Sequence, residues 1–281
     1  VDADWLHAHY VTSHGTLAWL AKRLFRLRAR IVSTAWGSDI LLTPSRSRAA
    51  GALTRAVLRA SALTTSDSLH MTTRMRELGA REVMTFPLGL EYLPTPSSTK
   101  EPHLFYGNRG LEVLYRPERV LQVFAAIAAS WPDARLVVAN DGSLATALAS
   151  IAAGLGLKVG ELRHGGQVEF VGRLDAQAQD RWYSAAQWYL SLPSSDSVAV
   201  SVLEAMSHGC VPLLSDLPAN RELVRDGENG VIVPDRDFDP ASLLDVAARA
   251  AVIAGSNRAW VAEHAMFEPA VARFVARLRE L

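Results

Sequence analysis

The first part of the chain alternates short apolar runs with longer amphipathic stretches. Apolar runs of strand length, flanked by turn residues, predict strands over residues 30–37, 62–66 and 82–89. Between them, apolar residues at helical spacing predict helices over Thr16–Arg28, Ser47–Arg59 and Ser68–Leu78. A short strand is also predicted near the start, where the sequence reads LHAHY.

The same alternation restarts after a Pro- and Ser-rich segment, Leu93–Pro102, which is typical of a linker. The predicted strands cover residues 103–107, 134–140, 168–172, 188–193, 211–215 and 230–234. The predicted helices are Pro117–Trp131, Ser143–Gly154, Ala176–Ala186, Ser201–His208, Ala219–Arg225 and Pro240–Ala254. A last helical pattern runs from Arg258 to Leu281 and is interrupted at Pro269.

This order of elements predicts the fold class. Apolar strands separated by amphipathic helices indicate parallel sheets with covered faces and right-handed crossovers. We therefore expect an α/β protein with two Rossmann-like domains whose parallel sheets face a cleft. The expected divisions are a partial first domain over 1–95, a complete second domain over 96–258, and a C-terminal helix over 259–281 that could cross back to the first domain. The chain starts at Val1, without an initiating Met, so we expect it to begin partway through its first domain.

Composition narrows the possible classes of protein. Basic and acidic residues both number 29, so bulk charge does not favour nucleic acid, and we predict no nucleic-acid partner. Cys210 is the only cysteine in the sequence, which excludes an internal disulfide and a multi-cysteine metal site. No stretch approaches the ~18–20 apolar residues of a membrane span. We expect a cytoplasmic protein, and the preference for Arg over Lys suggests a bacterial source.

The segment Ser194–Gly209, SSDSVAVSVLEAMSHG, carries the most chemistry. A loop of small residues follows a predicted strand and leads into a helix, so its backbone amides and the helix N-terminus favour an anion. Asp196 and Glu204 lie eight positions apart, and a carboxylate there could accept two hydrogen bonds from a ribose diol. The alternative is an ordinary helix start whose acids complement the helix dipole. Spacing alone favours that alternative.

The wider sequence favours the functional interpretation. The segment resembles the acid-x7-acid signature of retaining glycosyltransferases of family four, which have the two-domain GT-B fold. The resemblance continues through GCVPLLSDLPANRELVRDGENGVIVPD, residues 209–235, and covers the second domain well. It reaches the first domain through DADWLHAHY and STAWGSD. The family usually has Glu at both ends of the signature, whereas this chain has Asp196 at the first.

The resemblance implies roles for residues of this segment. Glu204 matches the acid that holds the nucleotide ribose, and Asp196 matches the acid that contacts donor-sugar hydroxyls. Backbone amides that contact sugar and phosphate are implied at Val198, Ala199, Val200 and Ser201.

A second implied group lies in GNRGLEVLYR, residues 107–116. This resembles the family's Gly-Arg turn, whose Arg and a following Lys hold the diphosphate. Arg109 matches the Arg, and Arg116 is the nearest substitute for the Lys. A departing nucleotide diphosphate gains negative charge, which fixed cations stabilise. The alternative is that either Arg is a solvated residue beside Glu112 or Glu118.

The first domain contributes candidates for the opposite wall. His7 and His9 alternate on the predicted short strand, and we expect them to face opposite ways, with one pointing to the cleft. His9 matches the histidine with which the family contacts the donor sugar, although a structural role is the alternative. Trp36, Ser38 and Asp39 lie at the end of the next strand and could line the acceptor side of the cleft or cap a turn.

The predicted helix near the start has a basic, amphipathic character. Leu17, Leu20, Leu24 and Leu27 form an apolar stripe, and Lys22, Arg23, Arg26 and Arg30 lie mostly off it. Such a helix can rest on an anionic membrane, at the inner face in a bacterial cell. The alternative is a helix whose stripe covers the sheet while its cations face water.

Together these features predict a retaining, hexosyl-type glycosyltransferase. The donor would be a nucleotide-diphosphate sugar, and the acceptor an unknown sugar, lipid or small molecule. We predict no metal and no cofactor, because cations and helix amides can stabilise the leaving diphosphate. The rival is a truncated or degenerate relative that binds nucleotide sugar without catalysis. A nucleotide-dependent dehydrogenase is disfavoured, because no GxGxxG follows a strand. Base, sugar, acceptor and oligomeric state stay open.

Overall fold

A computed structural model describes residues 3–96 and 99–281 of the chain. By its contacts the chain divides into two compact units. The first unit comprises Val1–Glu91, Ser195–Val198 and His264–Leu281, and the second comprises Tyr92–Ser194 and Ala199–Glu263. Val1 and Asp2, and Ser97 and Ser98 of the expected linker, lie outside the described residues.

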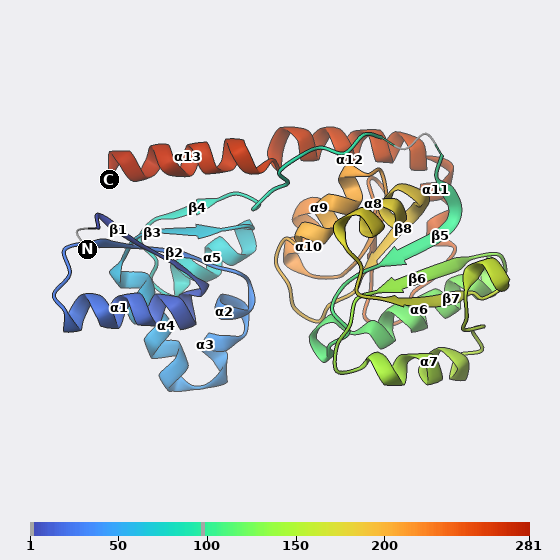
Figure 1. Cartoon of the computed structure of the whole chain (residues 1–281), viewed down its shortest axis with the longest axis horizontal. Helices are drawn as coiled ribbons and strands as arrows, with labels where there is room; N and C mark the ends of the chain where they lie inside the picture. The colour runs from blue at the N-terminus through green and yellow to red at the C-terminus, as the bar shows by residue number, and fades with distance from the viewer. Residues whose placement is uncertain (1–2, 97–98) are drawn as a thin grey trace. The chain divides into compact units, whose positions relative to one another are not determined.

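The first unit is built on a parallel sheet (Figure 1). Within the described residues, its strands follow one another in space in chain order, β1-β2-β3-β4. Their bounds are Trp5–His9, Arg30–Thr34, Ser61–Ser66 and Val83–Thr85. Strand β2 is shorter than predicted because it ends before the turn at Gly37, where φ is +100°. Strand β4 is also shorter than predicted, and Pro87, which cannot donate to the ladder, follows it.

The helices of the first unit follow its strands. They are η1 (Tyr10–His14, a π-helical turn), α1 (Gly15–Leu24), α2 (Ser38–Leu41), α3 (Thr43–Arg46), α4 (Arg48–Ala60), α5 (Leu69–Glu77) and α13 (Phe267–Glu280). The N-cap hydroxyls of Ser47 and Ser68 accept the backbone amides of Ala50 and Met71, which fixes where α4 and α5 begin. The apolar core of this unit includes Val11, Ile40, Val57, Leu58, Met71 and Met75.

The second unit is doubly wound. Among the described residues its parallel sheet has the order β10-β9-β8-β5-β6-β7. The bounds are β5 Glu101–Gly107, β6 Arg135–Ala139, β7 Val168–Gly172, β8 Ala186–Ser191, β9 Val211–Ser215 and β10 Val231–Val233. The chain runs outward from β5 to β7 and then returns to the other side of β5 with β8. The strand order therefore reverses between β5 and β8, and such a switch point opens a crevice at the carboxyl ends of the two strands.

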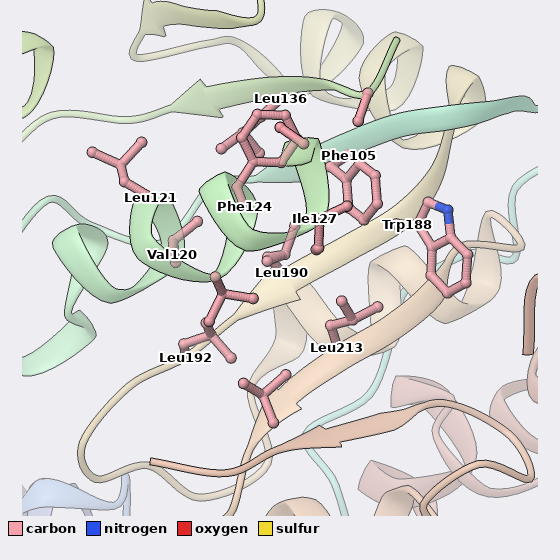
Figure 2. Close-up of a cluster of buried hydrophobic side chains, with 14 of the residues drawn as sticks. Phe105, Val120, Leu121, Phe124, Ile127, Leu136, Trp188, Leu190, Leu192 and Leu213 are labelled. Atoms are coloured by element: carbon pink, nitrogen blue, oxygen red, sulfur yellow. The ribbon is translucent and has the colours of Figure 1, made fainter. Parts of the chain in front are cut away.

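Helices of the second unit cover this sheet. They are α6 (Pro117–Ser130), α7 (Ala145–Gly154), α8 (Ala176–Ala185), α9 (Val200–Ser207), α10 (Pro218–Leu223), α11 (Ser242–Ala248) and α12 (Ala250–His264). Figure 2 shows aromatic and aliphatic side chains from α6 and the strands packed in one core. Phe105 stacks on Trp188 at 5.7 Å and meets Phe124 edge-on at 5.6 Å. The Trp188 indole donates to the carbonyl of Pro102 at 2.8 Å, so this buried nitrogen is satisfied.

The predicted α/β class with two parallel-sheet units is confirmed. Element bounds near the C-terminus differ from the prediction. The helix expected over Pro240–Ala254 is interrupted at Arg249, and α12 then continues without a break through residues 255–257. The interruption expected at Pro269 lies earlier, at Ala265 and Met266. Pro269 stands in the first turn of α13, where its missing amide costs no intrahelical hydrogen bond.

Candidate functional site

The candidate site lies at the switch point of the second unit. Strand β5 ends at Gly107 and the neighbouring β8 ends at Ser191, so their carboxyl ends lie side by side (Figure 1). Asn108 and Arg109 follow β5, and the loop after β8 leads into α9. This topology brings Arg109, Ser201 and Glu204 together, although they are up to 95 positions apart in the sequence.

Glu204 lies in the middle of α9, and its carboxylate is half-buried. The Tyr183 hydroxyl donates to its Oε2 at 2.9 Å. Burial raises the pKa of Glu204 above its ordinary value, the hydrogen bond from Tyr183 counteracts that rise, and the charge of Asp180 adds to it. A carboxylate anchored on one oxygen can still accept hydrogen bonds from a ligand diol on the other. Glu204 also lies beyond the first turn of α9, which is where an acid would complement the helix dipole.

Tyr183 belongs to a buried polar network that the sequence did not predict. Asn108 donates from Nδ2 to the Tyr183 hydroxyl at 2.8 Å and to Gln179 Oε1 at 2.6 Å. The Tyr189 hydroxyl in turn donates to Asn108 Oδ1 at 2.7 Å. Tyr183 and Tyr189 come from α8 and β8, and both rings are buried. The one sequence signal is that Asn108 follows the last residue of a strand beside the Gly-Arg turn; the tyrosines look like ordinary core aromatics.

Arg109 lies against the start of α9. Its guanidinium donates from Nη1 to the Ser201 hydroxyl at 3.1 Å and stacks over the Tyr115 ring at 4.5 Å. Helix α9 begins at Val200, and its N-cap residue, Ala199, supplies no side-chain hydrogen bond. A fixed cation beside a helix N-terminus without a side-chain cap is a chemically suitable environment for a phosphate.

Arg116 occupies a different environment. Its guanidinium donates to the carbonyls of Leu192 and Pro193 at 2.8 and 2.9 Å and to Asp235 at 2.8 Å. Its backbone has φ +48° at the start of α6. Arg116 thus fastens the beginning of the loop that leads to α9, and it could bind a phosphate only by giving up these partners.

The loop before α9 carries the other predicted residues. Val198 and Ala199 are buried, and Val200 is half-buried. Asp196 is half-buried, and its carboxylate accepts the backbone amide of Ser197 at 3.0 Å. By contacts, Ser195–Val198 is grouped with the first unit, where the Ser197 hydroxyl meets that of Ser68 at 2.8 Å.

A pocket of about 340 Å³ opens beside the buried network of the second unit. Its lining includes Asn108, Asn140, Arg173 and Gln179, so amide groups and a cation face it. Asn108 and Gln179 belong to both the pocket and the network that reaches Glu204. The pocket is thus connected to the Glu204 carboxylate through two hydrogen bonds, from Asn108 to Tyr183 and from Tyr183 to Glu204.

The first unit brings His9, Trp36 and Asp39 together. The His9 and Trp36 rings are 5.8 Å apart. The expectation that His7 and His9 face opposite ways is wrong, because their rings are only 4.5 Å apart. Residues two positions apart on a strand share a face, which is the period-two rule that the expectation misapplied. His7 also contacts Thr34 Oγ1 at 2.8 Å.

Asp39 is 2% exposed and acts as a clamp within the first unit. Its oxygens accept the backbone amides of Val11 at 2.7 Å and Trp36 at 2.9 Å. Burial raises the pKa of Asp39, and these backbone hydrogen bonds lower it. This geometry matches the turn-capping alternative for Asp39. Ser38 is exposed at the start of α2, and Trp36 is 39% exposed.

Asp67 is an acid that the sequence did not single out. It follows β3 directly, and the Ser197 hydroxyl donates to its Oδ1. Burial raises the pKa of Asp67 to about 7, while the hydrogen bond from Ser197 opposes this shift. A carboxyl that titrates near neutral pH is a common property of functional sites. Its position at a strand end was the available sequence signal.

The apolar stripe predicted for α1 does not cover the sheet, as the alternative considered above would require. Gly15 is buried, and a Cβ there would come within 2.8 Å of Val57, so the helix starts in close contact with α4. The apolar stripe is nonetheless exposed in the described structure, with Leu24 74% and Phe25 73% exposed. Arginines interleave with these apolar residues at the end of the helix. They are Arg23, Arg26 and Arg28, all exposed.

Comparison with known proteins defines the class. The family "Glycosyl transferases group 1" matches residues 104–251, more than half of the chain, and the chain therefore belongs to this family. Residues 1–68 match "Glycosyl transferase 4-like". The predicted glycosyltransferase superfamily is confirmed by these matches.

Individual relatives refine this result. The phosphatidyl-myo-inositol mannosyltransferase of Mycobacterium tuberculosis (strain H37Rv) is 30% identical over 128 residues, which are 45% of this chain and 32% of that protein. The same enzyme of Mycobacterium bovis matches equally. The matched region thus spans about a third of the length of these curated relatives.

Solved structures confirm the GT-B fold. Anabaena HepE in complex with UDP aligns with a TM-score of 0.81 and 15% identity over 99% of this chain and 79% of its own. The pneumococcal O-GlcNAc transferase GtfA, in complex with UDP and GlcNAc, aligns with a TM-score of 0.74 and 13% identity over 96% of this chain and 55% of its own.

None of the helices within residues 3–96 and 99–281 combines the length and apolarity needed to cross a bilayer. Over the same residues, no group of three or more His, Cys, Asp and Glu side chains is arranged to hold a metal ion. The prediction that catalysis needs no metal stays a prediction.

Proposed function

We propose that this protein transfers a sugar from a nucleotide-diphosphate sugar to an acceptor, with retention of configuration. The observation that carries the proposal is the arrangement at the switch point of the second unit. There the Glu204 carboxylate, held by Tyr183, lies on the same helix whose start is contacted by Arg109. The arrangement offers an acid for a ribose, a cation for a diphosphate, and a helix N-terminus between them.

In this proposal the nucleoside occupies the pocket beside Asn108 and Gln179, and its ribose hydroxyls hydrogen-bond to Glu204. Arg109 and the amides of Val200 and Ser201 receive the diphosphate. UDP is bound in the HepE and GtfA structures, which makes uridine nucleotides the first donors to test. As bond cleavage leaves charge on the departing diphosphate, Arg109 stabilises it without a metal or other cofactor.

The remaining roles rest on the resemblance to family-four enzymes. Asp196 would contact donor-sugar hydroxyls, and the amides of Val198 and Ala199 would contact sugar or phosphate. His9 would contribute from the first unit, with Trp36 and Ser38 beside the acceptor. Retention would follow if the acceptor attacks the face from which the diphosphate departs, through an oxocarbenium-like transition state.

Arg116 and Asp39 receive different roles from those first expected. We propose that Arg116 fixes the loop before α9, because its donors already hold Leu192, Pro193 and Asp235. We propose that Asp39 fixes a turn of the first unit, because backbone amides occupy both of its oxygens. Neither residue then needs to touch the donor.

A binding and turnover experiment tests the proposal. Calorimetry with UDP-glucose, UDP-N-acetylglucosamine and GDP-mannose measures donor affinity, and release of nucleoside diphosphate in the presence of sugar, lipid or small-molecule acceptors measures transfer. The proposal expects binding of at least one donor and transfer with the anomeric configuration retained. Binding without any transfer would favour the alternative, a nucleotide-sugar-binding relative without catalysis. Inversion at the anomeric carbon would contradict the retaining mechanism.

We also propose that the end of α1 rests on an anionic membrane surface. Leu24 and Phe25 expose apolar side chains beside Arg23, Arg26 and Arg28, and this combination suits the interface between lipid headgroups and acyl chains. The M. tuberculosis relative is named for a lipid acceptor, phosphatidyl-myo-inositol. A membrane-bound acceptor for this chain would give the surface a purpose.

A further inference from the structure

In the donor site proposed above, Glu204 is the acid that receives the ribose, and the structure shows how its side chain is held. Within the described residues, the side chain of Glu204 has one hydrogen-bond partner, the hydroxyl of Tyr183 at 2.9 Å. Tyr183 lies on α8, is 1% exposed, and is 21 positions away from Glu204 in the sequence. The bond therefore ties α9 to α8 at the point where the ligand would be bound.

The direction of this hydrogen bond is set by its neighbours. The Tyr189 hydroxyl donates to Asn108 Oδ1, which orients the Asn108 amide so that Nδ2 points to the Tyr183 oxygen. Because the Tyr183 oxygen accepts from Asn108, its own proton is directed elsewhere. The nearby acceptors are Glu204 Oε2 at 2.9 Å and the Ser201 carbonyl at 3.3 Å. The shorter bond to a charged acceptor is the stronger of the two.

We infer that Tyr183 is a positioning residue for Glu204: through the ordered series Tyr189, Asn108 and Tyr183, its hydroxyl holds the carboxylate in one orientation for the ribose of the donor. The inference rests on the proposed function, because it assumes that Glu204 receives a nucleotide. A carboxylate that is already held loses less side-chain freedom when the ligand binds. The same bond also favours the ionised form of Glu204, which is the form that accepts hydroxyl hydrogens.

The second consequence gives a readout that a merely structural tyrosine would not change. Loss of the Tyr183 hydroxyl should raise the pKa of Glu204 further, since the hydrogen bond opposes the effect of burial. As the pH is lowered, donor affinity should then begin to decrease at a higher pH than in the wild type. The other titratable groups that interact with Glu204 are Asp180 from α8, Tyr189 from β8, Tyr106 from β5 and Tyr92 from an adjoining loop. The charge of Arg109 acts on Tyr189.

Tyr106 provides a matched control. Its ring meets that of Tyr183 edge-on at 5.0 Å and is fully buried, as Tyr183 is. Its hydroxyl oxygen is buried without a hydrogen-bond partner among the residues that the structure describes. Tyr106→Phe therefore removes the same atom from the same aromatic cluster but removes no hydrogen bond to Tyr183 or Glu204.

The experiment measures UDP-glucose affinity by calorimetry across pH 5–8 (about the range in which a raised Glu pKa matters), with GDP-mannose as the second probe. Both diphosphates are esterified at each end, so the ligands add no phosphate titration in this range. Tyr183→Phe should bind UDP-glucose roughly tenfold more weakly than the wild type at low pH. The pH at which its affinity begins to decrease should be higher than in the wild type. Tyr106→Phe should match the wild type in both respects.

A double-mutant cycle with Glu204→Gln shows whether Tyr183 acts through Glu204. In the Glu204→Gln background, Tyr183→Phe should cost much less affinity than in the wild type, and the pH dependence should be absent. If Tyr183→Phe does not fold, Tyr189→Phe tests the same series, because it leaves Tyr183 in place and frees the Asn108 amide to turn. It should show a smaller loss in the same direction.

The outcomes separate the two proposals. If the wild type binds donor, and both Tyr183→Phe and Tyr106→Phe have the affinity and pH profile of the wild type, the positioning role is wrong and the proposed function stands. An undiminished effect of Tyr183→Phe in the Glu204→Gln background would also overturn the positioning role. If wild type and Tyr106→Phe both fail to bind either nucleotide sugar, the proposed function fails, and this inference fails with it.

Discussion

Asp39 in the first unit and Glu204 in the second are acids that follow parallel strands, and their carboxylates are held in opposite ways. Backbone amides of Val11 and Trp36 occupy both oxygens of Asp39, which is almost fully buried. A tyrosine hydroxyl holds one oxygen of the half-buried Glu204. A carboxylate whose two oxygens both accept main-chain amides stabilises a turn. A carboxylate with a partner on one oxygen only can still accept hydrogen bonds from a ligand on the other.

Arg109 and Arg116 differ in a parallel way. The guanidinium of Arg116 donates hydrogen bonds to carbonyls of the loop before α9 and to Asp235. Arg109 contacts the Ser201 hydroxyl and the face of Tyr115, and lies where α9 begins. Residue type and position at a strand end therefore do not separate a structural role from the ligand-binding role that we propose. The partners of the side chain do.

The largest effect that we expect is on folding, from Asp39→Ala. The substitution leaves two buried amides without an acceptor, so the first unit should lose about 3 kcal/mol of stability. The melting temperature should fall by several degrees, while donor affinity measured below the transition is unchanged. Asp4→Ala, which removes an exposed acid of the same unit, is the control and should melt like the wild type. Normal melting of Asp39→Ala would show that the clamp does not stabilise the fold.

Glu204→Gln should have the next largest effect, and on binding. Hydrogen bonds to charged groups contribute roughly 1.5–3 kcal/mol, so donor affinity should fall about tenfold or more. Titration calorimetry measures this loss. Unchanged affinity for every donor tested would remove Glu204 from the site.

The same variant should alter how stability depends on pH. The folded pKa of Glu204 is raised by burial, so the folded chain keeps a proton that the unfolded chain has lost. The free energy of unfolding therefore falls as the pH rises from the ordinary range of Glu through the raised pKa. Glu204→Gln should lack this contribution, which melting curves across pH would show. Donor binding has the opposite trend in the wild type, because it needs the carboxylate.

Arg109→Ala should weaken diphosphate binding by roughly 1.5 kcal/mol, about tenfold, because it removes a charge-assisted contact. Uridine, which has no phosphate, should bind the variant almost as well as the wild type. Arg116→Ala is the comparison: it should lower the melting temperature and affect uridine and UDP alike. Equal losses for uridine and UDP in Arg109→Ala would contradict a phosphate role for Arg109.

The smallest effect concerns the membrane surface at the end of α1. Each basic residue near an anionic surface contributes about 1 kcal/mol, so Arg26→Ala should weaken binding to phosphatidylserine-containing vesicles about fivefold. Added salt should reduce the difference. Arg279→Ala changes the same charge in the last turn of α13 and should bind vesicles like the wild type. If the wild type does not cosediment with these vesicles at low salt, the proposal that the end of α1 binds an anionic membrane is wrong.

The sequence predicted much of the fold because local patterns specify local structure. The period of apolar residues identified β3, β5–β9 and most helices, since a strand or a helix must bury one face. The prediction for His7 and His9 was wrong because the two-residue period of a strand was misapplied. Helix ends were also predicted poorly where they depend on a single turn, as at Arg249 and Ala265. The predicted apolar stripe of α1 is shorter than expected, because the helix ends at Leu24 and Leu27 lies beyond it. Its exposure could not be predicted, because periodicity does not say what packs against a face.

The sequence by itself determined the class of protein and the segment in which we propose the donor site. Strand, small-residue loop and acid-bearing helix occur consecutively over residues 186–207, and Arg109 directly follows another strand. Only the tertiary structure decided which side chains meet at the candidate site. Asn108, Tyr183 and Tyr189 meet Glu204 because the order of strands reverses between β5 and β8, so their side chains converge from separate segments. Hydrogen bonds between such segments depend on distances in space, and a linear pattern of residue types does not contain those distances.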